Sequence, residues 1–337
     1  HYTLLGATAT VEQLVARAVA EGMPALALTD SCALYGAVAF SQACRAANIQ
    51  SIIGMVLHVS LPEAINLPGP AWGDLLLLAT GPSGYQSLCA LTSLVQGSPQ
   101  REQLVKRGLP WEQIQTHTSG LIAIDSGQTG WLARLVQAGQ TKMAARYASR
   151  LAGLFEDNGY LGVTLHTTAD EAMAREAMGI GDRFGLRATA VQPVFCLEES
   201  EAPRLRLLAA IDQNCPVDEV AAETLPAGGR AESKLYWLSA EAVQERFAAF
   251  PEALQTVGEI IDQCQPALPD GRPIWPKLDL PDEQSAEDAL EAAAEAGLRE
   301  KYGRSPQKAI KTRLEKELAS INRYGFAPLF LLVADIT

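Results

Sequence analysis

The sequence predicts an α/β fold in which helices cover a parallel sheet. Up to about residue 215, short apolar runs typical of buried strands alternate with amphipathic helical segments, in about six or seven strand–helix units. The 337 residues are 48% hydrophobic and 20% charged, which excludes a disordered, collagenous or coiled-coil chain. At this length a closed barrel is more natural than an open sheet, although periodicity alone does not decide between them.

The expected elements follow one another from the N-terminus. Thr10 is a suitable N-cap for a first helix that Gly22 ends. Its apolar stripe consists of Val11, Leu14, Val15, Ala18 and Val19. Strands are expected at 25–29, 52–59, 75–79, 121–124, 160–165 and 186–190. Between them, helices are expected around 38–43 and at 85–95, 131–155 and 170–184, with a break at Gly139.

The C-terminal third has a different organisation, which predicts three regions. Residues 1–265 form a barrel-like domain with a helical extension at 216–265. Residues 266–281 contain five prolines and form an extended linker. Residues 282–337 hold helices that begin at Ser285 and at Ser305, and then a strand at 329–333. Since a buried strand needs partners, and the first residue is His1, we expect a chain trimmed at both ends.

Charge and cysteine content limit the classes of function. With 27 basic and 39 acidic residues the net charge is −12, so the chain is a poor general binder of nucleic acid and would need a local basic patch or a partner domain. One run is locally basic, but glutamates interleave with it, so we expect a solvated helix face with ion pairs. The run consists of Lys308, Lys311, Arg313 and Lys316, with Glu315 and Glu317 between them.

The six cysteines contain no C-x-x-C pair and do not suggest a disulfide framework, which favours a reducing cytoplasm. No apolar run reaches about 18 residues, so no membrane span is expected.

Few residues at the predicted strand ends carry chemistry. Asp30 could bind a metal, but an aspartate that caps the next helix is the favoured interpretation. His166 is interpreted as hydrogen-bonded packing rather than as a ligand. Asp125 lies in a common Asp-Ser-Gly turn, and Gly81–Gly84 is a simple helix cap. No cysteine is visibly paired with a histidine, so the residues predict a barrel with an impoverished site.

The order of the segments nevertheless resembles one family. The pieces that carry the resemblance are residues 2–5, 14–18, 22–30, 34–40, 52–54, 76–79, 84–88, 120–123, 160–161, 250–254, 313–318 and 324–335. Together they resemble the N-terminal PHP domain of the bacterial DNA polymerase III alpha subunit, a C-family polymerase, followed by the entry into its palm. The resemblance covers nearly the whole chain and implies a distorted (βα)7 barrel.

The departures from the family pattern concern its three-metal centre. Asp30 and His166 remain at ligand positions. The other ligand positions that this chain covers are occupied by Ser31, Val56, Gly127, Gly162, Val191 and Pro193. Valine and glycine cannot bind a cation, and two ligands cannot hold a trinuclear centre. We therefore expect no catalytic residues and no cofactor. The alternative is a partly retained site that binds Zn or Mn, since the family's His-x-His motif, which would precede Tyr2, could add two ligands.

The resemblance implies an N-terminal PHP fragment that acts in DNA replication as a structural and interaction module. The family's palm carboxylates lie beyond this chain, so it cannot polymerise DNA alone. The expected partners are the rest of the alpha subunit, including palm and thumb, and replisome proteins, with DNA reached only through the full-length polymerase. One alternative is a metal-dependent phosphoesterase or 3′–5′ proofreading exonuclease, another is a direct DNA-binding module. An error-prone relative of the polymerase also fits.

Overall fold

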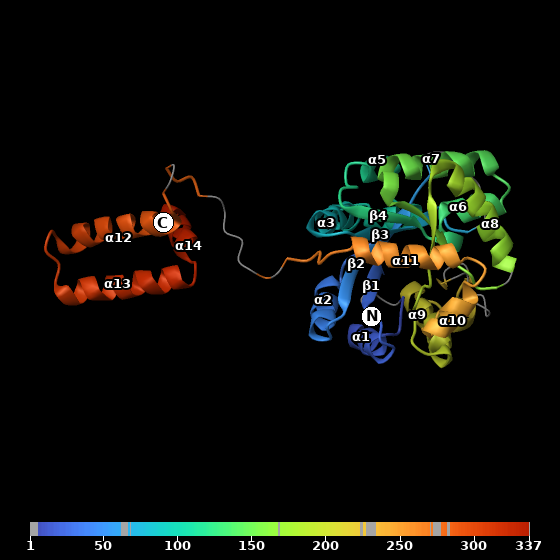
Figure 1. Cartoon of the computed structure of the whole chain (residues 1–337), viewed down its shortest axis with the longest axis horizontal. Helices are drawn as coiled ribbons and strands as arrows, with labels where there is room; N and C mark the ends of the chain where they lie inside the picture. Colours follow the sequence, from blue (N-terminus) through green and yellow to red (C-terminus); the bar gives the residue numbers. More distant parts are fainter. Residues whose placement is uncertain are drawn as a thin grey trace. The chain divides into compact units, whose positions relative to one another are not determined.

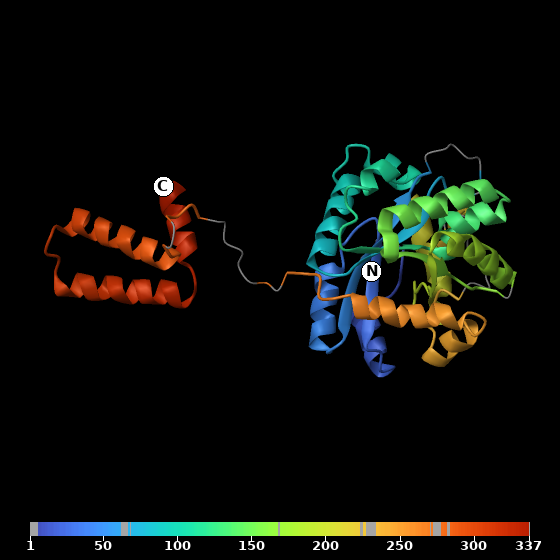
Figure 2. The ribbon, with the colours of Figure 1, turned by 45° about the horizontal axis from the view of Figure 1, so that its top comes forward.

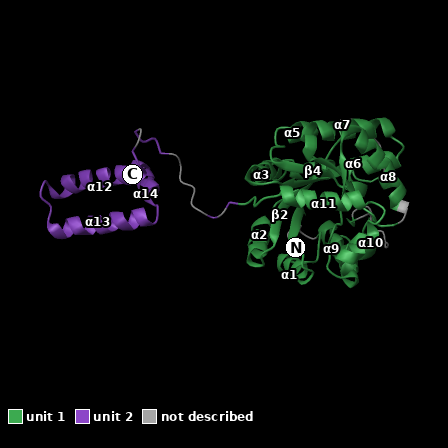
Figure 3. Cartoon of the chain, in the orientation of Figure 1, with its two compact units in different colours: residues 1–268 green, residues 269–337 purple. Residues whose placement is uncertain are grey.

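The structure, a computed structural model, describes residues 6–61, 67, 69–167, 169–222, 225–226, 234–269, 271, 278–281 and 284–336. The chain divides into two compact units, His1–Leu268 and Pro269–Thr337 (Figure 3). The division falls inside the proline-rich segment 266–281. His1, the segment 2–5 and residues 272–277 of the proline-rich segment lie outside the described residues.

The first unit is built on one mixed sheet whose strands pair in chain order (Figure 1). The strands are β1 (Ala25–Ser31), β2 (Gln50–Val59), β3 (Gly73–Ala79), β4 (Leu121–Asp125), β5 (Gly159–Val163) and β6 (Arg187–Ala190). The α/β class is confirmed, and every predicted strand of this unit is present. The prediction of an all-parallel sheet is wrong, because β3 runs antiparallel to both β2 and β4. The described residues of the connection between β2 and β3 include no helix, and parallel neighbours require a crossover, usually an α-helix, of a dozen or more residues.

Helices fill the remaining connections, and Gly139 separates two of them as expected. They are α1 (Val11–Ala20), α2 (Ala37–Ala46), α3 (Pro82–Gln96), α4 (Arg101–Arg107), α5 (Trp111–Ile114), α6 (Trp131–Gln137), α7 (Thr141–Phe155), α8 (Ala169–Gly181), α9 (Ala202–Gln213), α10 (Ala240–Arg246) and α11 (Pro251–Gln263). Thr10 and Gln13 form a capping box on α1. Val19 was expected in the apolar stripe of α1 but is 51% exposed. The buried side of α1 consists of Val11, Val15 and Ala18 and does not extend as far around the helix as Val19.

The two faces of the sheet have separate cores. The larger core joins Ile53, Met55 and Leu77 to the helices that cover the outside of the sheet. The smaller core joins alternate side chains of the strands to Ile260 and Cys264 of α11. These strand residues are Ile52, Leu78, Ile122, Ile124 and Tyr160. Figure 2 shows α11, in orange, crossing the strands.

Hydrogen bonds fix α11 in this place. The side-chain amide of Gln50 donates to the carbonyl oxygens of Ile261 and Cys264 at 3.0 and 2.8 Å. Gln50 lies where β2 begins, so α11 covers the end of the sheet opposite to the carboxyl ends of the parallel strands. The candidate ligand positions lie at those carboxyl ends.

The second unit consists of α12 (Ala286–Tyr302), α13 (Lys308–Arg323) and α14 (Ala327–Ile336). The predicted strand at 329–333 is wrong, since these residues lie within α14. A short apolar run does not distinguish a buried strand from a helix by periodicity, and here the run continues over ten residues after Gly325, whose φ of +67° ends α13. Among the described residues, no helix is long and apolar enough to cross a membrane.

Candidate functional site

Asp30, the first candidate ligand, serves as a helix cap. It lies near the end of β1 and is only 5% exposed. Its Oδ2 accepts a hydrogen bond from the backbone N–H of Gly36 at 3.0 Å, and Gly36 is the N-cap residue of α2. This hydrogen bond is the one expected of an aspartate that organises the start of the following helix.

His166, the second candidate ligand, lies in the turn between β5 and α8. Its backbone N–H and that of Thr167 donate to Oδ2 of Asp170 at 2.8 and 2.7 Å. Burial alone would raise the pKa of Asp170, but these two N–H groups outweigh it and the pKa is lowered. Asp170 therefore stays ionised and holds the first turn of α8 against the loop that carries His166.

Two of the lost ligand positions have no room for a side chain. A Cβ atom on Gly162 would lie 2.4 Å from the carbonyl oxygen of Asp125 and 3.1 Å from both the Gly127 nitrogen and Val191 Cγ2. A Cβ atom on Gly127 would lie 2.6 Å from Thr164 Oγ1, and Gly127 has a φ of +60° that disfavours any other residue. Backbone and neighbouring side chains therefore fill the space that ligands at these positions would need.

The other lost positions belong to regular strand structure or to the adjoining loop. Ser31 is the register partner of Val56 in the β1–β2 pair. Val191 continues the pairing of β6, because its N–H donates to the carbonyl oxygen of Val163 at 2.9 Å. Across the part of the chain that the structure describes, no three histidine, cysteine, aspartate or glutamate side chains gather where they could hold a metal ion.

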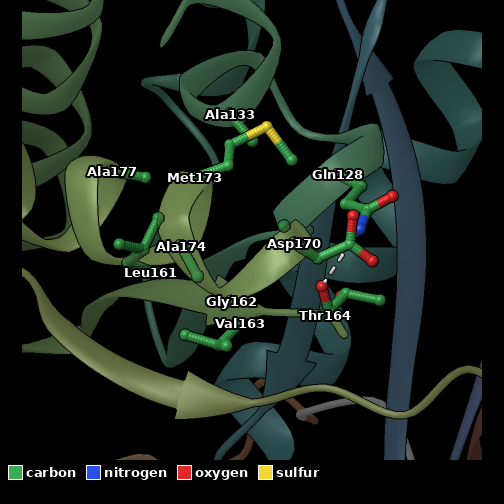
Figure 4. Close-up of a pocket in the computed structure, with 11 residues that line it drawn as sticks. Gln128, Ala133, Leu161, Gly162, Val163, Thr164, Asp170, Met173, Ala174 and Ala177 are labelled. Atoms are coloured by element: carbon green, nitrogen blue, oxygen red, sulfur yellow. Dashed lines mark hydrogen bonds between the residues drawn. The ribbon is translucent and has the colours of Figure 1, made fainter. Parts of the chain in front are cut away.

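A small cavity lies beside these positions, between the ends of β4 and β5 and helix α8 (Figure 4). Its volume is about 20 Å³, which is room for a single water molecule. Met173, Ala174 and Leu161 form much of its lining, and Gln128 Nε2 donates to the Thr164 carbonyl oxygen at 3.3 Å. The cavity is too small for a phosphate ester or for several cations.

The structure also reveals a buried charged cluster that sequence reasoning missed. Asp125 is fully buried, and burial raises the pKa of its carboxyl to about 8 although the Leu132 N–H donates to it at 3.1 Å. Burial likewise raises the pKa of Asp74 on β3. The positive charge of the Arg134 guanidinium opposes this rise in pKa at both carboxyls, so Arg134 is a counter-charge that they share. It is held by the carbonyl oxygens of Pro70, at 2.7 Å, and Trp72.

A cysteine–histidine pair adjoins this cluster, which corrects the expectation that no cysteine is paired with a histidine. Nδ1 of His58 donates to the Val105 carbonyl oxygen at 2.9 Å, and Nε2 lies 3.7 Å from Oδ1 of Asp74. Burial alone would lower the pKa of His58, but a hydrogen bond with the Cys32 side chain and the charge of Asp74 outweigh it and raise the pKa to about 9. Cys32 itself is buried, with a left-handed φ of 51°.

These residues were missed because they are far apart in sequence. Only the strand register, which places His58 opposite Asp74, brings them together. One sequence signal was available, since Asp74 directly precedes the apolar run 75–79 of a buried strand. A charged residue at that point is costly unless it is paired. The resulting cluster places His58 and Arg134 beside Asp74 and lies at the same sheet end as the lost ligand positions.

Comparison with known proteins identifies the class of the first unit. Residues 1–166 match the PHP domain family. This part of the first unit is therefore a PHP domain, a family of the (βα)7 barrel type, and the described residues of the unit supply six strands of its sheet.

The second unit identifies the particular family. Residues 288–337 match the bacterial DNA polymerase III alpha NTPase domain. The DNA polymerase III subunit alpha of Bacillus subtilis (strain 168) is 30% identical over 334 residues, which cover 99% of this chain. The error-prone DNA polymerase of Mycobacterium tuberculosis (strain ATCC 25618 / H37Rv) is also 30% identical, over 349 residues and 100% of this chain. The chain is similar over its whole length to DNA polymerase III alpha subunits and error-prone DNA polymerases, and it corresponds to their PHP domain and the beginning of the region that follows.

The chain spans 28% of the length of the Bacillus relative and 30% of the Mycobacterium relative.

Proposed function

We propose that the PHP barrel of this chain is a structural and interaction module of a DNA polymerase, without metal-dependent activity of its own. The observation that carries the proposal is the packing at Gly162, where a Cβ atom would lie 2.4 Å from the Asp125 carbonyl oxygen. A metal ligand at this position requires not only another residue but also a different arrangement of β4 and β5.

The donor groups present do not fit a three-metal centre. The carboxylate of Asp30 is engaged with the Gly36 N–H at the start of α2. Val56 and Val191 offer no donor atom, and Ser31 is a weak substitute for an imidazole. No catalytic step through a metal is therefore derived for this chain.

Charge balance at the strand ends supports the same proposal. Two carboxyls, the buried Asp125 and the half-buried Asp74, remain there and repel each other when both are ionised. Arg134 supplies positive charge between them from within the chain, with its guanidinium stacked 4.6 Å from the ring centre of Trp131. A cation from solution is not needed to neutralise this end of the barrel.

The partners follow from the relatives. We place the chain beside the rest of an alpha subunit, including palm and thumb, and with replisome proteins, so that template DNA is handled mainly by the remainder of the polymerase. Exposed apolar side chains on α14 support contact with further protein, since Phe330, Val333 and Ile336 are 47%, 49% and 76% exposed. The six free cysteines support a reducing cytoplasm as the location.

Metal content tests the proposal. The purified chain is incubated with excess Mn²⁺ or Zn²⁺, dialysed and analysed for bound metal, and then assayed for phosphoesterase and 3′–5′ exonuclease activity. We expect substoichiometric metal and no turnover. Stoichiometric metal, with turnover that Asp30→Ala or His166→Ala abolishes, would overturn the proposal and make the chain a metal-dependent phosphoesterase or proofreading exonuclease.

A further inference from the structure

The charge of the chain is reversed in one segment of the second unit. The whole chain carries −12, yet residues 301–323 hold seven basic and two acidic residues. Since charges beyond about 8–10 Å are largely screened at physiological salt, a ligand at this segment responds to the local positive charge rather than to the acidic total.

Helix α13 sorts its residues by face. Ile310, Leu314, Leu318 and Ile321 are half-buried and form the apolar side, whereas every other residue of the helix is exposed. The opposite side carries a basic face, defined here as Lys308, Thr312, Arg313, Lys316 and Arg323.

The two glutamates of α13 do not neutralise this face. Glu317 forms an ion pair with Arg313 at 2.9 Å, at the margin of the basic face. Glu315 follows Lys308 by seven residues and lies at the other margin. Among the described residues, Lys308 and Lys316 form no ion pair, and both lie on the exposed side of the helix together with Ala309, Thr312 and Arg313. The expectation of a face laced with ion pairs therefore holds only for Arg313.

Two exposed aromatic rings accompany the basic face, one beside Arg323 at its C-terminal end and one near Arg313. Tyr324 is 62% exposed, stacks on Phe326 with ring centres 6.1 Å apart, and lies 5.6 Å from the guanidinium of Arg323. Tyr302 is 48% exposed and is near Arg313, because Glu317 first and then the phenol of Tyr302 raise the pKa of that arginine.

We infer that the basic face of α13 and the flanking Tyr302 and Tyr324 form a binding surface for single-stranded nucleic acid. Proteins that bind single strands combine positive charge that follows the phosphates with aromatic rings on which bases stack, and the basic face with its two tyrosines offers both features. The inference goes beyond the structural role proposed for the barrel, because it concerns the second unit and does not depend on the state of the metal site.

Two properties of α13 favour a single strand over other polyanions. A duplex keeps its bases stacked internally and offers no base to Tyr324, whereas each unpaired base presents a ring face. An anionic membrane would need the apolar side of the helix for insertion, but that side is half-buried within the unit.

Binding of a fluorescent dT20 strand to the full chain, measured by anisotropy over a range of salt concentrations, tests the inference. The charge variant is Lys308→Gln with Lys316→Gln, and its control is Lys106→Gln with Lys142→Gln on the barrel. The stacking variant is Tyr324→Ala, and its control is Tyr35→Ala, which removes another half-exposed ring.

We expect the charge variant to flatten the slope of log K against log salt by about 1.4, since each phosphate contact on a single strand contributes about 0.7. Tyr324→Ala should weaken binding roughly fivefold or more at an unchanged slope, and should have no effect on an abasic strand of equal length. Both controls should match wild type. Absence of binding at low salt, equal affinity for a duplex, or wild-type behaviour of both variants would overturn the inference.

Discussion

Replacing Gly162 by alanine tests the central claim that the strand ends leave no space for a ligand. The added Cβ would lie 2.4 Å from the Asp125 carbonyl oxygen and 3.1 Å from Val191 Cγ2. Ordinary contacts between heavy atoms are about 3.5–4.0 Å, so the β4 backbone has to retreat by roughly 1 Å. Gly153→Ala is the matched control, because a Cβ there meets nothing within 4 Å and the residue lies inside α7.

The size of the effect follows from this geometry. Overpacking of a well-packed interior costs about 1–3 kcal/mol, and the contact at Gly162 is with backbone that cannot rotate away, so we expect about 3 kcal/mol. For a domain of this size, 1 kcal/mol corresponds to about 2–4 °C, and the Tm should fall by about 6–12 °C. Gly153→Ala should be neutral or stabilising by up to about 1 kcal/mol, as expected for glycine in a helix.

Thermal unfolding followed by circular dichroism, supported by urea titration, measures both variants. A Gly162→Ala protein whose stability lies within about 1 kcal/mol of wild type would refute the reasoning, because it would show that this strand end accepts a side chain. A ligand could then occupy the position without rearrangement, and the steric part of the argument for a metal-free barrel would be lost.

Three further changes probe the same end of the barrel. Asp125→Asn should become more stable relative to wild type as pH rises from about 4 to about 8. The carboxyl of wild-type Asp125 has its pKa raised to about 8, so its contribution to folding stability is full below the unfolded pKa of 3.8 and is lost as pH rises through this window. Urea titrations at several pH values measure the difference in stability between the two proteins, and a difference that does not change with pH contradicts the prediction. Arg134→Met should cost about 3–5 kcal/mol, since it removes the arginine that faces both carboxyls and leaves only His58 beside Asp74. The loss should shrink in Asp125→Asn, and equal losses in both backgrounds would show that Arg134 and Asp125 do not interact. Asp30→Ala should cost about 0.5–2 kcal/mol through the lost hydrogen bond to Gly36 and leave metal content unchanged; a change in bound metal would identify Asp30 as a ligand.

Sequence patterns predicted the elements better than their directions. The strands at β1, β2 and β4 to β6 were evident from apolar runs bounded by turn residues. The direction of β3 depends on its connection, and no pattern inside 75–79 carries it. The run 329–333 was assigned to a strand because five apolar residues suit either structure, and the length of α14 is set by its packing against α12.

The candidate site was predictable where one residue acts locally and hidden where two strands cooperate. Asp30 caps the helix that follows it in sequence, so its role was visible from local spacing. Asp125 was set aside as a common turn residue, yet it is completely buried, because burial depends on the packing of α6 and β3 around it. Cys32, His58 and Asp74 meet only through the register of three strands.

The glycines at ligand positions and the carboxyls that remain at this end of the barrel follow from one physical requirement, which is that charge removed from water must be neutralised. Removing a metal centre leaves buried carboxyls that must be neutralised or protonated. Asp125 meets this condition through a raised pKa, and Arg134 meets it for Asp74 with a guanidinium held by two backbone carbonyls. Gly162 and Gly127 then let the ends of β4 and β5 close over the emptied space. This arrangement supports the proposal of a barrel that keeps its shape without a metal ion.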